Sequence, residues 1–198
     1  MSTEIFLAFI TYAFVTSITP GPNNSMLLAS GVNYGFLRSL PHVLGISVGF
    51  ALMVMAVGAG LGRVFDAFPF MYSVLRICGA TYLVYLAWQI ATARPMQDSI
   101  APGRPFGFWK AAGFQWVNPK AWIMAIGAIS TYVPEGEDIR YVAIISILFA
   151  IVNAPSITVW VTFGAMLRHW LTDIRHLRIF NILMAILLLL SLYPLLFQ

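Results

Sequence analysis

The amino-acid sequence predicts an all-α fold, a polytopic transmembrane helical bundle with six spans. Composition is the first observation behind this, because 60% of the 198 residues are hydrophobic and only 9% are charged. Soluble domains are about 45–50% apolar and about 25% charged. The second observation is a series of six apolar stretches joined by short polar connections. Lipid is therefore the expected solvent for most of the surface, and residues 1–198 are expected to form a single transmembrane domain.

The six spans are placed by length and hydropathy, since about 20 helical residues cross the hydrocarbon of a bilayer. They are residues 5–30, 41–61, 67–91, 111–133, 141–167 and 179–197. The second begins with Pro41, because proline is favoured in a first helical turn. The longest connection, residues 92–110, is expected to be a cytoplasmic loop between halves at about 1–92 and 106–198.

The basic residues predict the orientation of the chain. Loops 1–2, 3–4 and 5–6 carry seven of them: Arg38, Arg94, Arg104, Lys110, Arg168, Arg175 and Arg178. The opposite loops carry two, Arg63 and Arg140. Because cytoplasmic loops are enriched in Lys and Arg, both termini are expected to be periplasmic. The net charge is +4, but the basic residues are scattered singly through short loops, so nucleic acid is not an expected partner.

The first span contains a sequence that is hostile to a continuous helix. It reads Thr19-Pro20-Gly21-Pro22-Asn23-Asn24, and each proline removes a backbone donor and clashes with the preceding turn. Broken backbone at membrane depth is tolerated only where protein or a watery cavity satisfies it. The break is therefore expected to face inward.

The fourth span repeats the pattern with Gln115 and then Asn118-Pro119-Lys120 at a similar depth. Gly21-Pro22 and Asn118-Pro119 could each cap and start a second half-helix. The two new N-termini would then meet from opposite sides and suit an anion such as a carboxylate. Interrupted helices in corresponding positions of a 3+3 inverted repeat point to a transporter's binding site, although prolines also kink purely structural helices.

Lys120 and Asn153 are the remaining candidate site residues. A lysine deep in the bilayer costs on the order of 3 kcal/mol, so Lys120 is expected to face a cavity and meet a carboxylate or carry a proton; snorkelling to the interface is the alternative. Asn153, two residues before Pro155 in the fifth span, either contacts substrate or holds a carbonyl freed by the proline.

Acidic residues are confined to loops, termini and interfaces. The membrane interior thus has no carboxylate for a substrate side-chain ammonium, which favours neutral zwitterions, and none for a proton relay. His42, His169 and His176 lie at segment ends or in a loop, so the sequence shows no catalytic set, metal site or cofactor. The glycine pairs 31/35, 45/49 and 58/62 permit close helix packing within one chain or in a homodimer.

With these residues the chain resembles the LysE/RhtB family of bacterial amino-acid exporters. The resemblance is carried by Thr19-Pro20-Gly21-Pro22-Asn23, by Gly45 and Gly49, by Gly79-Ala80-Thr81-Tyr82-Leu83, and by Phe114-Gln115-Trp116-Val117-Asn118-Pro119-Lys120. Asn23-Asn24 is similar to the branch that exports cysteine and O-acetylserine. Two residues do not fix a substrate, and homoserine, threonine and leucine-like substrates are the alternatives.

This resemblance implies secondary active export of amino acids across the bacterial inner membrane, with a proton as the candidate coupling ion. A passive channel or structural assembly protein is the alternative, and an intramembrane enzyme is the least favoured.

Overall fold

The computed structural model describes residues 1–61, 67–68, 70–93, 105–134, 139–171 and 173–191. In these residues all regular structure is helical, which confirms the all-α polytopic membrane fold. Three helical segments are long and apolar enough to cross a membrane: Phe36–Leu61, Ser73–Ala91 and Ile139–Leu167. Helices α1 (Thr3–Ile18) and α2 (Pro22–Tyr34) make a fourth if they are one span, bent by 55°. Six spans and an inverted repeat stay predictions.

The second helical stretch begins earlier than the sequence predicts. Helix α3 (Phe36–Ala56) starts at Phe36, and Pro41 lies inside it, so the predicted start at Pro41 is wrong. Gly35 between α2 and α3 has φ 80°, a backbone region that favours glycine. The chain therefore turns within one residue, and the Ser39 hydroxyl donates to the Gly35 carbonyl at 2.9 Å.

The rest of the described chain continues with a π-helical turn, η1 (Val57–Leu61), and five α-helices. These are α5 (Phe70–Ala91), α6 (Phe108–Gln115), α7 (Pro119–Tyr132), α8 (Ile139–Leu167) and α9 (Ile174–Leu190). Lys110 lies in α6, which corrects its placement in the predicted 92–110 loop. Several predicted features lie outside the described residues: loop residues 94–104, Arg63, Gly62, and positions 192–197 of the sixth span.

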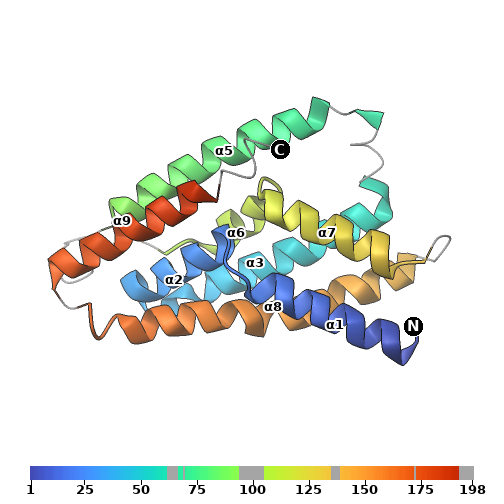
Figure 1. Cartoon of the computed structure of the whole chain (residues 1–198), viewed down its shortest axis with the longest axis horizontal. Coiled ribbons are helices and arrows are strands. Elements are labelled where there is room, and N and C mark those ends of the chain that lie inside the picture. Colours follow the sequence, from blue (N-terminus) through green and yellow to red (C-terminus); the bar gives the residue numbers. More distant parts are fainter. Residues whose placement is uncertain (62–66, 69, 94–104, 135–138, 172, 192–198) are drawn as a thin grey trace.

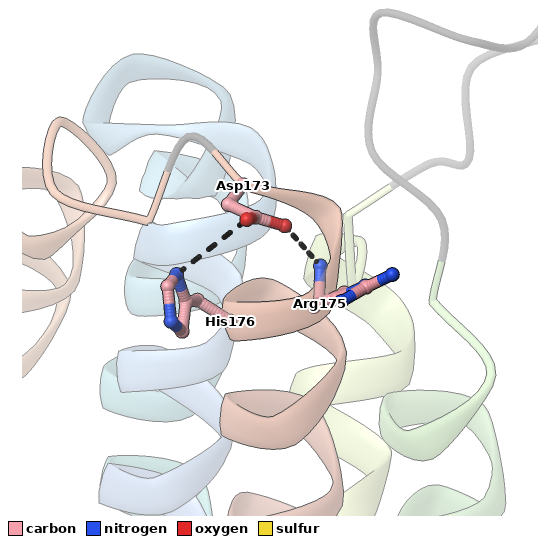
Figure 2. Close-up of polar contacts among 3 residues, drawn as sticks. All are labelled: Asp173, Arg175 and His176. Atoms are coloured by element: carbon pink, nitrogen blue, oxygen red, sulfur yellow. Dashed lines mark hydrogen bonds and ion pairs between the residues drawn. The ribbon is translucent and has the colours of Figure 1, made fainter.

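The sixth stretch also begins before its predicted start, at Ile174 in place of residue 179. Figure 2 shows the reason: Asp173 Oδ1 accepts a hydrogen bond of 2.7 Å from the backbone N–H of Arg175. This caps α9, as aspartate does at many helix starts. Asp173 Oδ2 also lies 4.0 Å from His176 Nδ1, and both of these side chains are exposed.

Helix packing brings the two halves of the chain together. Helix α3 packs against α6 and α8, α2 packs against α8, and α5 lies beside α9 (Figure 1). A Cβ on Gly49 would lie 2.5 Å from Ala112 Cα in α6, and one on Gly45 would clash with the Phe108 carbonyl oxygen. This glycine pair therefore serves packing within one chain, the first of the two predicted uses.

Aromatic rings fill the core between α1, α3, α7 and α8. Phe149 lies 4.8 Å from Phe50 and 5.6 Å from Phe9, measured between ring centroids. Phe9 also contacts Tyr132 at 5.3 Å. We call Phe9, Phe50, Tyr132 and Phe149 the aromatic cluster. It borders the two helix breaks, because Phe50 belongs to both the cluster and the cavity described next.

Candidate binding site at the two helix breaks

The first break lies between α1 and α2, and its carbonyl groups are paired with side chains from other helices. Asn24 Nδ2 donates to the carbonyls of Ser17 and Thr19, both at 2.8 Å. Trp160 Nε1, from α8, donates to the Ile18 carbonyl at 3.0 Å. The last carbonyls of a helix have no partner inside that helix, so α2 and α8 supply them.

Lys120 supplies the remaining donors to the first break. Its Nζ lies 2.8 Å from the Thr19 carbonyl oxygen, 3.0 Å from Thr19 Oγ1 and 3.2 Å from the Pro20 carbonyl oxygen. An ammonium has three donors, and a cation is favoured at the negative end of a helix dipole. Lys120 therefore ties α7 to the end of α1 and does not snorkel along its own helix.

The second break separates α6 from α7 and has the expected cap. Asn118 is the N-cap, with its side-chain oxygen accepting from the Lys120 backbone N–H at 3.2 Å, and Pro119 is the first helical residue. Trp122 Nε1 donates to the Trp116 carbonyl at 2.9 Å. Pro22 likewise opens α2. Both predicted half-helix starts are therefore confirmed.

The two breaks are also joined by a pair of amides. Asn23 Nδ2 donates to Gln115 Oε1 at 2.9 Å, and Gln115 Nε2 donates back to Asn23 Oδ1 at 3.1 Å. Gln115 Nε2 also donates to the Ala111 carbonyl at 2.9 Å, and its side chain is fully buried. Asn23 and Gln115 are 92 residues apart in the sequence, so their contact places the two breaks next to each other in the fold. The depth of the breaks in the membrane stays a prediction.

A small cavity of about 20 Å³ lies where the breaks meet. Six predicted site residues line it, and six residues that the sequence analysis did not select complete the wall. The predicted ones are Gly21, Asn23, Asn24, Asn118, Lys120 and Asn153, and the others are Thr16, Ser17, Phe50, Ala121, Met124 and Ile157. Pro20, Pro22, Gln115 and Pro119 frame the breaks without lining the cavity.

One polar atom of this cavity has no partner among the described residues. Asn24 is 2% exposed, and its Oδ1 accepts no hydrogen bond. A buried unpaired acceptor costs about 1–3 kcal/mol, so an incoming donor such as a water or an ammonium would be stabilised there. The Asn24 amide thus offers an acceptor next to the Lys120 ammonium.

Asn153 lines the cavity and pairs with side chains from two other helices, and its contact with substrate stays a prediction. Its Nδ2 donates to Ser17 Oγ at 3.0 Å, and its Oδ1 accepts from Ser47 Oγ at 3.4 Å. It therefore connects α8 to α1 and α3 and binds no carbonyl freed by Pro155. Besides the six unselected wall residues, the sequence analysis also missed Trp160, because a lone indole in an apolar helix gives no signal of its contact with Ile18.

Chemically, the site combines one cation, several amides, helix N-termini and freed carbonyls, and no carboxylate lines it among the described residues. Such a combination can bind groups of both charges. Polar half-helices that meet inside an apolar bundle are the binding architecture of many membrane transport proteins.

Comparison with known proteins identifies the family of transport proteins to which this chain belongs. The model of the LysE type translocator family matches residues 14–193. The chain therefore belongs to the LysE family, and it functions as an amino-acid exporter, a multi-pass protein of the bacterial inner membrane.

Curated relatives agree along nearly the whole chain. The cysteine/O-acetylserine efflux protein of Salmonella choleraesuis (strain SC-B67) is 37% identical over 193 residues, 95% of each chain. The protein of the same name from Escherichia coli (strain K12) is 34% identical over 192 residues, also 95% of each. These names describe transport and not an enzyme. No solved structure matches the chain significantly.

Proposed function

We propose that this protein exports small neutral zwitterionic amino acids, cysteine and O-acetylserine first among them, by alternating access at the two helix breaks. The substrate class follows from the names of the relatives, which are 34–37% identical, and from the absence of a carboxylate on the described cavity wall. With the positive side inside, both termini would be periplasmic.

The observation that carries this proposal is the bonding of Lys120 across the breaks. Its ammonium pairs with the carbonyls of Thr19 and Pro20 at 2.8 and 3.2 Å. A zwitterion carries both parts of such a pair. Its carboxylate can take the place of the carbonyls at Lys120, and its ammonium can take the place of Lys120 at the carbonyls and reach Asn24 Oδ1.

Substrate binding requires the breaks to separate. A cavity of about 20 Å³ has room for about one water, so this conformation is closed to an amino acid. Opening would break the bonds of Lys120 to Thr19 and the mutual amide bonds of Asn23 and Gln115. The substrate supplies equivalent polar groups, so it lowers the free-energy cost of separating the breaks. A ligand that binds the open state more tightly shifts the equilibrium toward that state.

Alternating access then follows from the position of the breaks between the halves at about 1–92 and 106–198. The first break belongs to one half and the second to the other, so rocking of the halves would open the site to each side in turn. Phe50, which lines the cavity and contacts Phe149, would close one side. A proton would drive export, and two chains would form a homodimer.

The decisive experiment measures transport by the purified protein in proteoliposomes. Vesicles loaded with cysteine kept reduced, O-acetylserine, threonine, leucine or lysine are diluted into labelled amino acid, and counterflow is recorded. We expect counterflow with the first two and at least tenfold less with lysine, whose second ammonium finds no carboxylate on the described wall. Equal counterflow with lysine would contradict the proposed substrate class.

The same vesicles separate an exporter from a channel. An exporter shows accelerated exchange when substrate is present on both sides, because the loaded site turns over faster than the unloaded one. A channel shows passive flux without such stimulation. If exchange is not stimulated and the flux does not saturate with substrate concentration, the protein is a passive channel and the proposal of alternating access is wrong.

A further inference from the structure

A second cavity lies further along α2, beyond the binding site. It measures about 70 Å³ and is lined by residues of α2, α3 and α5 and by Ala93 and Phe106. Its polar wall includes Ser30, Asn33, His42 and Gln89. A buried water needs about 10–15 Å³ of such room and a few polar partners, so several waters fit here.

The imidazole of His42 is the unpaired group on this wall. The side chain is 1% exposed, and neither Nδ1 nor Nε2 has a hydrogen-bond partner among the described residues. Two of the neighbouring polar groups are already paired: Ser30 Oγ lies 2.7 Å from Ser39 Oγ, and Asn33 Nδ2 donates to Asn181 Oδ1 at 2.8 Å. Waters in the cavity are therefore the partners available to the ring. The expectation that His42 lies at a segment end is wrong, because α3 begins six residues before it.

Other ionisable groups do not compete with His42 for a proton in this cavity. Helices α2, α3, α5, α6 and α8 contain no Asp or Glu. Tyr34, on α2, is the other titratable side chain on the described wall. Among the cations of these helices, Arg38, Arg76, Lys110 and Arg140 are exposed, and Arg168, just after α8, is half-buried. A histidine that is in contact with water gains and loses a proton near neutral pH, and in transporters Asp, Glu and His inside the membrane form proton relays.

Helices α2 and α3 each line both the His42 cavity and the binding cavity. On α2, Asn23 and Asn24 line the binding cavity, and Met26 and Ala29 line the His42 cavity. On α3, Phe50 and His42 line them respectively, about 12 Å apart along the helix axis. Movement of α2 at the first break therefore changes the surroundings of His42.

We propose that His42 is the proton-carrying group that couples export to proton entry. This rests on the proposed function, since it names the residue that would link a proton to the substrate cycle. The neutral ring takes a proton from a cavity water on its free nitrogen and becomes an imidazolium. When α2 returns, the imidazolium releases that proton to water on the opposite side, so one proton crosses and no other bond is made or broken.

Two measurements on proteoliposomes test the assignment, with His42→Gln and the matched control His169→Gln, which makes the same change at an exposed histidine. The first is cysteine counterflow at equal pH on both sides, and the second is cysteine accumulation driven by an imposed pH gradient. We expect H42Q to lose gradient-driven accumulation at least tenfold while counterflow stays within about threefold, and H169Q to match wild type in both. Wild-type accumulation by H42Q would overturn the role of His42.

A further measurement decides the matter if H42Q folds poorly. The chain has three histidines, so a His169→Gln/His176→Gln variant retains His42 alone, and its labelled ring can be followed by NMR in bilayers. Chemical shifts of the His42 ring that change between about pH 5 and 8 support the proposal, and chemical shifts that stay constant overturn it. Failure of wild-type counterflow would instead reject the proposed function, so the two failures are distinguishable.

Discussion

Replacing Lys120 by methionine tests the link between the two breaks most directly. Methionine keeps the apolar stem of the lysine side chain but removes the ammonium. Three bonds are lost, at 2.8, 3.0 and 3.2 Å to Thr19 and Pro20. The Thr19 carbonyl keeps its bond to Asn24 Nδ2, whereas no other donor to the Pro20 carbonyl is recorded among the described residues.

The magnitude follows from the chemistry of one charged hydrogen bond. Such a bond contributes about 1.5–3 kcal/mol, and 1.4 kcal/mol corresponds to a factor of ten. If the substrate carboxylate takes over the equivalent of one bond at Lys120, K120M should lower cysteine counterflow about ten- to a hundredfold.

The assay is initial-rate counterflow in proteoliposomes with equal amounts of folded protein, judged by size-exclusion profile and unfolding temperature in detergent. Lys110→Met is the matched control, because Lys110 is an exposed lysine on α6 and should transport normally. Counterflow by K120M within about twofold of wild type would refute the reasoning, because the ammonium would then have no part in binding.

Two further predictions concern stability. Trp160→Phe removes the donor to the Ile18 carbonyl and should destabilise the protein by about 1–2 kcal/mol, measured as a lower unfolding temperature in detergent. Trp170→Phe, at an exposed indole, is the control. Equal losses of stability in both variants would contradict the capping role of Trp160. Gly49→Ala should destabilise the protein because its Cβ would lie 2.5 Å from Ala112 Cα. By contrast, Gly113→Ala, with nothing within 4 Å, should stabilise α6 by about 0.5–1 kcal/mol; the reverse order of unfolding temperatures would show that the α3–α6 approach is looser than described.

Some features of the site could be predicted because they depend on local backbone chemistry. Proline lacks a backbone donor wherever it stands, so Pro22 and Pro119 predict helix starts without any knowledge of packing. Asn118 predicts its own cap for the same reason. The structure confirms all three.

Other features escaped sequence reasoning because they depend on which helices meet. Pro41 predicts a helix start, yet Gly35 turns the chain and α3 begins five residues sooner, at Phe36. Lys120 lines a cavity as expected, but the pairing of its ammonium with the end of α1 depends on how α7 packs against α1. His42 was placed at a segment end, although packing against Phe106, at 5.1 Å between ring centroids, helps to bury it.

By itself, the sequence determined that this chain is an all-α membrane protein and that two of its helical stretches are broken. Both conclusions rest on properties of single residues: the cost of placing side chains in lipid and the geometry of proline. Only the tertiary structure decided how the broken ends are satisfied, by Asn24, Lys120 and Trp160 from three different helices. Those partners lie up to 142 residues from the carbonyls they bind, and contacts across such separations are set by helix packing, which no local pattern encodes.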